Sequence, residues 1–280
     1  MSNSVQYANA EGECSIQTQL EQGVLTVSIG QKDASFFWDL RVIHDLFALF
    51  QKADADEAVR VLIVQGSGPD FCAGLVARAD TGDSMEERAR IKNAMELVQQ
   101  LRTRTLKLLS KPVIALVRGR CSGVGIRLIE GCDIIYAQDD SQFFFAQDEL
   151  GLLALIPGGA DGPSCMSARA RSYYSICEQY FDGNAAEQSG LVTFSSSAQE
   201  IVEAVQSLAK TLSEKDPLAV KFTKDTLAHV GSMSWDASVN FTAAKFAELK
   251  ALQAVSEGSA TRASAVASFL AGKSKPGLGR

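Results

Sequence analysis

The feature that most constrains this chain is an apolar run that ends in a glycine-rich turn. Residues 112–117 are apolar and rich in β-branched side chains, which predicts a buried strand. Gly119, Gly123 and Gly125 follow, and residues 124–131 have the pattern of a short helix. Glycine lets a backbone approach a ligand where a Cβ would collide, and the first N–H groups of a helix have no partner within it. The segment predicts either backbone donors that face a negative atom or a tight strand-to-helix connection without a ligand.

A second apolar run, residues 59–64, ends in a loop of the same kind. This loop contains Gly66 and Gly68 and closes on a Cys-Ala-Gly turn that ends at Gly74. Two such loops, each after a strand, are able to supply one N–H apiece to a single oxygen. That is the geometry of an oxyanion hole, in which backbone donors stabilise a developing negative charge.

Five segments, in order along the chain, resemble the crotonase (enoyl-CoA hydratase/isomerase) superfamily. Residues 68–74 resemble the family's G-x-x-F-x-A-G, residues 111–115 its K-P-V-I-A, and residues 132–137 its C-D-I-I-Y-A. Residues 156–159 resemble its I-P-G-x-G, and residues 181–192 its x-G-x-x-x-x-A-E-x-x-G-L-V. Any one of these segments is a weak signal, but together they are specific and cover most of the chain.

The fold class that we expect is α/β. The hydrophobic pattern predicts strands at residues 23–29, 59–64, 112–117 and 133–137, and helices at 38–53, 84–109, 124–131, 164–180 and 184–190. The resemblance implies a crotonase-like spiral of ββα turns with a C-terminal helical region. We therefore expect a core that contains the thioester site over residues 1–195, and a helical, trimer-forming region over residues 196–280. Helices are predicted at 201–212, 218–229 and 235–270, before a tail at 272–280.

The resemblance implies a shared chemical step, which is stabilisation of an enolate formed from an acyl-CoA thioester. In the family, two backbone N–H groups bind the thioester oxygen, and these positions fall on Leu75 and Val124. A side chain is not needed for this role, because the amide N–H alone donates. Gly74, Gly123 and Gly125 flank the two donors and are expected to line the place where the substrate binds.

Acid–base groups decide which reaction follows, and here the chain departs from the hydratases. The first of their two glutamates falls on Arg127, which cannot act as a base; it either binds a substrate carboxylate or forms an ion pair. The second falls on Gln147 by ungapped counting, or on Glu149 if the Phe-Ala-Gln-Asp-Glu segment is aligned with F-G-x-P-E. We assign the acid–base role to Glu149, with Asp148 next, because desolvation beside phenylalanines raises a carboxyl pKa. The alternative is that both are solvated loop charges.

The expected reaction is of the hydratase/lyase type. Residues 233–236 and 273–278 resemble the C-terminal region of hydroxycinnamoyl-CoA hydratase-lyases, but their tyrosine falls near Phe241 or Ala243, which lack a hydroxyl. Isomerisation, decarboxylation, hydrolysis and a non-catalytic role stay open. Residues 30–37 replace the family's N-R-P segment, so that an acyl carrier protein is an alternative to coenzyme A as the carrier of the acyl group.

The composition of the chain limits which partners and which cellular location we expect. The net charge is −6 without a basic run, which argues against nucleic acid. No apolar stretch is long enough to span a membrane and no signal pattern is present, so we expect a cytoplasmic protein without a membrane partner. Six scattered cysteines and two histidines favour free thiols and no metal site. We expect no cofactor beyond the coenzyme A of the substrate, and a homotrimer or hexamer from the resemblance.

Overall fold

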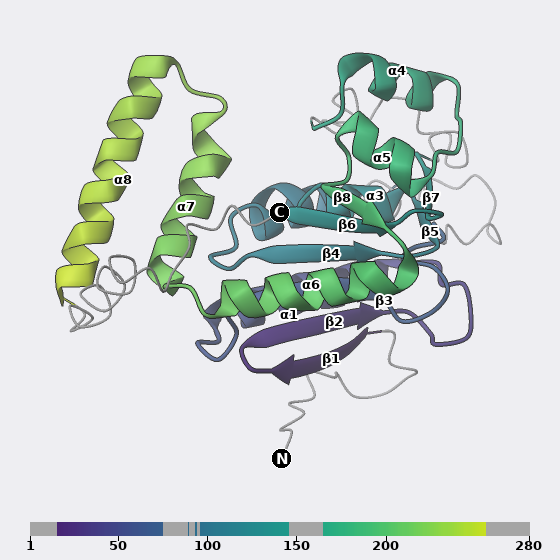
Figure 1. The fold of residues 1–280 in the computed structure, drawn as a ribbon, viewed down its shortest axis with the longest axis horizontal. Helices are drawn as coiled ribbons and strands as arrows, with labels where there is room; N and C mark the ends of the chain where they lie inside the picture. The colour runs from purple at the N-terminus through teal and green to yellow at the C-terminus, as the bar shows by residue number, and fades with distance from the viewer. Residues whose placement is uncertain (1–15, 75–88, 90–92, 94–95, 146–164, 256–280) are drawn as a thin grey trace. The chain divides into compact units, whose positions relative to one another are not determined.

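The computed structural model describes residues 16–74, 89, 93, 96–145 and 165–255, and the chain divides into two compact units (Figure 1). The first unit is Met1–Lys215 and the second is Asp216–Arg280. The division falls after Lys215 rather than after residue 195, where the sequence placed it. The reason is α6 (Ala198–Ser213), which buries its apolar face against the sheet of the first unit.

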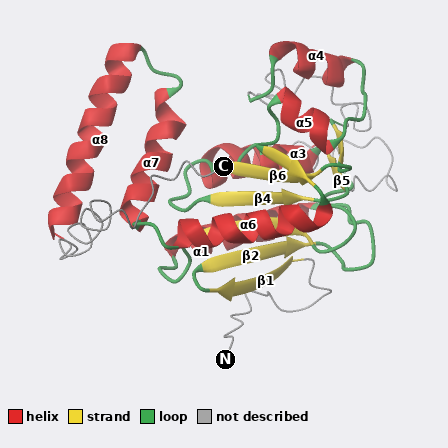
Figure 2. Ribbon diagram, viewed as in Figure 1, coloured by secondary structure: helices red, strands yellow, loops and turns green. Residues whose placement is uncertain are grey.

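The first unit is built on a six-stranded sheet, drawn in yellow in Figure 2. In spatial order its strands are β1 (Ile16–Glu21), β2 (Val24–Ile29), β3 (Val61–Gly66), β4 (Val113–Val117), β6 (Ile134–Gln138) and β8 (Phe194–Ser196). Strands β1 and β2 form an antiparallel hairpin, and every later neighbour pair is parallel. Parallel strands need crossover connections, which the helices supply.

Helices cover both faces of this sheet, and the alternation of side chains along the strands decides which residues face which layer. Leu62 and Val64 of β3 join the main core with α1 (Leu40–Ala55), the π-helix η2 (Leu101–Leu106) and α3 (Val124–Ile129). Val61 and Ile63 point the other way. There they pack with the stripe of α6 side chains Ile201, Val205 and Ala209.

A second, two-stranded sheet lies beyond the end of β4. It pairs β5 (Arg120–Ser122) with β7 (Gln142–Phe144) in parallel. Two isolated bridges extend it, from Cys72 to Cys121 and from Phe143 to Phe181. The second bridge brings in the region of α4 (Ala168–Ile176) and α5 (Gly183–Ser189). Segments from four parts of the chain therefore meet in this small sheet.

The described part of the second unit, which ends at residue 255, contains two helices, α7 (Pro217–Val230) and α8 (Trp235–Val255). The side chain of Asp216 caps α7 and Pro217 is its first residue, a position where a missing N–H costs nothing. Lys245 of α8 pairs with Asp225 of α7 at 2.8 Å, which joins the two helices.

The α/β fold class is confirmed, and most predicted elements are present. Strand β1 and the three-residue strands β5, β7 and β8 were not predicted. Of the helix expected at 84–109, residues 96–100 are helical and η2 continues as a π-helix. The predicted helical residues 256–270 and the tail at 272–280 lie outside the described residues. In the parts that the structure describes, no helix is long and apolar enough to cross a membrane.

Candidate active site

The two glycine-rich loops of the sequence lie against each other, held by backbone hydrogen bonds. Cys72 of the first loop donates its N–H to the carbonyl of Arg120 at 2.9 Å, and Ser122 donates to the carbonyl of Cys72 at 2.9 Å. Gly74, two residues after Cys72, has a φ of 141° that favours glycine, and its carbonyl accepts from the Trp38 N–H at 2.9 Å. The predicted meeting of the loops is therefore present up to Gly74; Leu75 lies outside the described residues.

Gly125 allows the closest contact between α3 and the first loop. A Cβ at this position would lie 2.6 Å from the Cβ of Cys72 and 3.2 Å from the Sγ atoms of both Cys72 and Cys121. No side chain fits there without movement of one of the loops. Gly123, just before the helix, has a φ of 49°, and its N–H donates to the carbonyl of Phe144 at 3.0 Å. The turn is thus fixed to both β5 and β7.

Val124 is the first residue of α3, and its side chain is buried. Its backbone N–H donates to no acceptor among the residues that the structure describes, while the neighbouring Gly123 N–H is already used. The first N–H groups of a helix have no partner within it, which explains why the Val124 N–H has no acceptor in α3. The donor role of Val124 stays a prediction, with its N–H bonded to none of the described residues.

An ion pair that the sequence did not predict joins the bases of the two loops. Asp70 is buried, and its Oδ1 accepts from the Arg120 backbone N–H at 2.9 Å while its Oδ2 accepts from Nη2 of the same arginine at 2.8 Å. Arg120 also donates to the hydroxyl of Ser35. Burial raises the pKa of Asp70, but the hydrogen bonds from Arg120 and Ser35 outweigh burial and hold this pKa below its usual value. Asp70 is thus a charged, structural side chain behind the site.

The cysteines near the loops are free thiols, as predicted for the described ones. Cys72 and Cys121 are buried, and burial raises the pKa of Cys72 to about 12 and that of Cys121 well above its usual value. A thiol attacks or binds metal as the thiolate, which these pKa values disfavour. No group of three His, Cys, Asp or Glu side chains able to hold a metal ion occurs in the described part of the chain.

Arg127 of α3 forms an ion pair, one of the two roles left open for it by the sequence. Its Nη1 lies 3.2 Å from Oε2 of Glu130, and Nη1 of Arg102 lies 3.1 Å from the same oxygen. Arg102 belongs to η2, so the pair also links η2 to α3. Its assignment to substrate binding stays a prediction.

The predicted acid–base residues Asp148 and Glu149 lie outside the described residues, and so does Gln147, which the sequence predicts to bind substrate. The strand that leads to them is apolar and buried: Phe143 stacks on Phe181 with ring centroids 5.5 Å apart. Phe145 packs on the same Phe181 ring at 5.6 Å.

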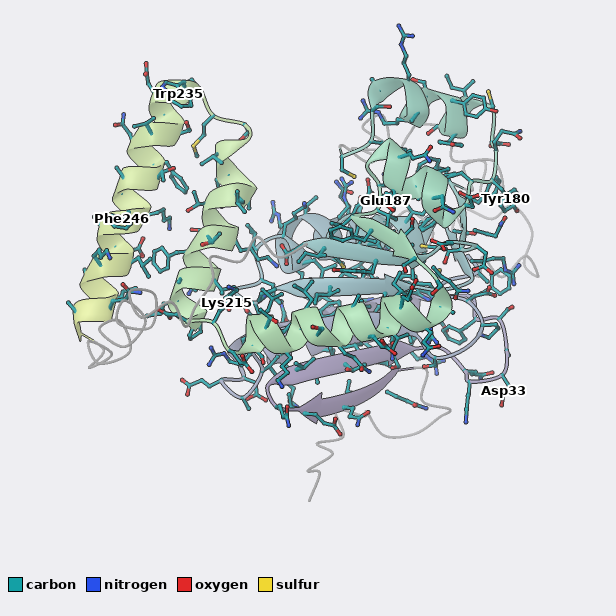
Figure 3. The ribbon with its side chains drawn as sticks, in the orientation of Figure 1. Asp33, Tyr180, Glu187, Lys215, Trp235 and Phe246 are labelled. Atoms are coloured by element: carbon teal, nitrogen blue, oxygen red, sulfur yellow. The ribbon has the colours of Figure 1, made fainter. Side chains whose placement is uncertain are left out.

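One further aromatic contact lies at the edge of this region. Tyr180, labelled in Figure 3, lies between α4 and α5 and stacks on Phe144 at 4.4 Å. Phe144 accepts the Gly123 N–H through its carbonyl, so this exposed tyrosine covers a residue that fixes the turn before Val124.

Comparison with known proteins identifies the family to which this chain belongs. The model of the enoyl-CoA hydratase/isomerase family matches residues 19–263. The chain therefore belongs to this family, the crotonase superfamily, whose members process acyl-CoA thioesters.

Particular relatives differ in the reaction that their names state. The chain is 30% identical over 220 residues to a peroxisomal Δ(3,5)-Δ(2,4)-dienoyl-CoA isomerase of Arabidopsis thaliana, covering 71% of this chain and 76% of the relative. It is 25% identical over 274 residues to a hydroxycinnamoyl-CoA hydratase-lyase of Pseudomonas fluorescens, covering 94% and 95%.

Solved structures share the fold. Pseudomonas aeruginosa DspI superposes with a TM-score of 0.81 at 19% identity, covering 97% of this chain and 99% of the other. An enoyl-CoA hydratase from Shewanella pealeana superposes with a TM-score of 0.75 at 21% identity, covering 93% and 94%.

Proposed function

We propose that the backbone N–H groups of Val124 and Leu75 bind the thioester oxygen of an acyl-CoA and stabilise its enolate. The observation that carries this proposal is the unspent N–H of Val124 next to the first loop. The bridge between Cys72 and Cys121 supports the second donor, because it holds the loop that leads to Leu75 against the loop that leads to Val124.

The reaction that we propose is of the hydratase/lyase type, with Glu149 as the acid–base group and Asp148 as its alternate. Arg127 stands where a hydratase has its first glutamate and is held by Glu130, so a mechanism with two glutamates is disfavoured. The likeness to a hydratase-lyase along 94% of the chain supports this choice.

Isomerisation is the second candidate, favoured by the 30% identity to a dienoyl-CoA isomerase. The two candidates share the enolate but differ in the bonds that change. Hydration adds water across the double bond and cleavage breaks the bond between the α- and β-carbons, whereas isomerisation removes a proton from one carbon and returns it to another. Decarboxylation, hydrolysis and a non-catalytic role are further alternatives.

The test is an assay of the purified chain with enoyl-, dienoyl- and 3-hydroxyacyl-thioesters, on coenzyme A and on an acyl carrier protein. We expect hydration or cleavage products from the enoyl and 3-hydroxyacyl species; a double-bond shift in the dienoyl species alone would assign the isomerase. Turnover of none of these thioesters would overturn the proposed function.

A double variant tests the assignment of the acid–base residues. Asp148→Asn combined with Glu149→Gln is expected to lower kcat by about 10²- to 10⁴-fold, the usual contribution of general acid–base catalysis. Asp140→Asn, which removes an exposed carboxylate upstream, is the control and is expected to leave kcat unchanged. Full activity of the double variant would refute this assignment and leave the enolate proposal standing.

The proposal also covers the oligomeric state of the protein and its location in the cell. We infer a homotrimer or hexamer formed through the second unit, in which large apolar side chains of α7 and α8 are exposed; Trp235 and Phe246 are labelled in Figure 3. The proposed partner is a small acyl thioester, with an acyl carrier protein as the alternative carrier, in the cytoplasm. No cofactor beyond the coenzyme A of the substrate is needed for this chemistry.

A further inference from the structure

Three charged side chains meet where α3 packs on η2. Oε2 of Glu130 accepts from Nη1 of Arg127 at 3.2 Å and from Nη1 of Arg102 at 3.1 Å. The side chains are 18%, 14% and 4% exposed for Arg127, Arg102 and Glu130, respectively. We call these three residues the arginine cluster. The two arginine side chains of the cluster are partly exposed to solvent, whereas the glutamate side chain is buried.

The arginine cluster carries an excess of positive charge. Two guanidinium groups share one carboxylate, and one carboxylate neutralises only one of them. An uncompensated charge in a poorly solvated place is costly, so an anion that enters this place is favoured.

The arginine cluster also has more donors than acceptors. A guanidinium carries five N–H donors, and each arginine spends Nη1 on Glu130. Among the described residues, Nε of Arg102 is buried without a hydrogen-bond partner, and so is Oε1 of Glu130. Because the two guanidinium groups have more N–H donors than the acceptors that the described residues offer them, the missing group is an acceptor. A carboxylate is the acceptor whose two oxygens match the planar fork of arginine.

The arginine cluster lies near the proposed thioester site, because Arg127 and Val124 belong to the same short helix. Arg127 follows Val124 by three residues on α3, which is about 4.5 Å of helix rise. Arg102 comes from a π-helix, a rare conformation that is frequent at functional sites. An acyl group whose thioester oxygen is bound by the Val124 N–H therefore has a cationic group within the reach of a short carbon chain.

We propose that Arg127, with Arg102 beside it, binds a carboxylate at the far end of the acyl group. The substrate class is then a short dicarboxylic acyl thioester, a conclusion that rests on the proposed function. Glu130 is a positioning residue: it holds both guanidinium groups in place and makes no contact with the substrate.

The test compares two thioesters with the same five-carbon chain, glutaryl-CoA and pentanoyl-CoA, by isothermal titration calorimetry. We expect the wild-type chain to bind glutaryl-CoA at least about 10-fold more tightly, since a hydrogen bond to a charged group contributes about 1.5–3 kcal/mol and each 1.4 kcal/mol is tenfold. Arg127→Gln is expected to remove this preference and to keep the affinity for pentanoyl-CoA. Arg104→Gln, an exposed arginine of the same η2, is the matched control and is expected to keep the preference.

The outcomes separate this inference from the proposed function. Equal affinity of the wild type for both thioesters, or a preference that survives Arg127→Gln, overturns the inference alone. Binding of neither thioester overturns the proposed function as well. If Arg127→Gln does not fold, Arg127→Lys replaces it: the lysine keeps the charge beside Glu130 but loses the planar fork, so the preference is expected to fall several-fold. An unchanged preference in that variant contradicts the inference.

Discussion

Replacement of Val124 by proline is expected to lower kcat by about 10²- to 10³-fold, the usual cost of removing one oxyanion donor. Val124 is the first residue of α3, where proline is well tolerated because the N–H has no partner within the helix. The variant deletes the proposed catalytic donor and also replaces a buried side chain. The measurements are kcat on the thioester that the wild type turns over best, and the free energy of unfolding in denaturant, which is expected to fall by about 1–3 kcal/mol, as in the alanine variant of the same residue.

Val124→Ala is the control for this experiment. It keeps the N–H and shortens a buried side chain, so we expect a loss of stability of about 1–3 kcal/mol and a kcat within a few-fold of the wild type. If the alanine variant loses as much activity as the proline variant, the side chain and not the N–H is what matters, and the assignment of the donor is wrong.

Replacement of Gly119 by alanine is expected to lower the free energy of unfolding by roughly 2–5 kcal/mol, because strain and overpacking add at this position. Gly119 has a φ of 61°, and a Cβ there would lie 1.9 Å from the carbonyl oxygen of Pro69 and 3.0 Å from Oδ1 of Asp70. The backbone of one loop must move away from the other. Since the same contact brings Asp70 to Arg120, we also expect a large loss of kcat.

Gly231→Ala is the matched control. Gly231 has an ordinary helical φ of −63°, and a Cβ there meets no atom within 4 Å. Alanine is expected to be neutral or to stabilise the chain by about 0.4–1 kcal/mol. Denaturant unfolding of both variants checks this pair, and equal stability of the two would contradict the close approach of the loops.

The parts of the fold that the sequence predicted are those with a long hydrophobic period. Strands β3 and β4 are continuous apolar runs, and α1 and α6 repeat apolar residues at helical spacing. Strands β5, β7 and β8 have three residues each, too few to show a period, and only pairing with distant segments makes them strands.

The division between the units shows a second limit of local patterns. The apolar stripe of α6 and that of α7 look alike in the sequence, because periodicity shows that a face is buried but not against what. The Asp216-Pro217 break was the available signal, since it ends one helix and caps the next where the units divide.

For the site, the glycine-rich turns and the start of α3 at Val124 were predictable because they depend on the backbone and on local spacing, while the roles of these residues stay predictions. The pairing of Asp70 with Arg120 joins residues 50 positions apart, and no local pattern encodes it. The pair of Arg127 with Glu130 has the spacing of neighbours on one helix face and was foreseeable. The second arginine, Arg102, was not, because it comes from η2.

The central claim is that two backbone donors hold one thioester oxygen. The most direct measurement is a crystal structure of the chain with a bound acyl-CoA, in which the distances from the thioester oxygen to the nitrogens of Val124 and Leu75 are read. We expect both distances to be about 2.7–3.1 Å. A thioester oxygen that lies beyond hydrogen-bond distance of either nitrogen, or a Val124 N–H bonded to a carbonyl of the protein itself, would contradict the account.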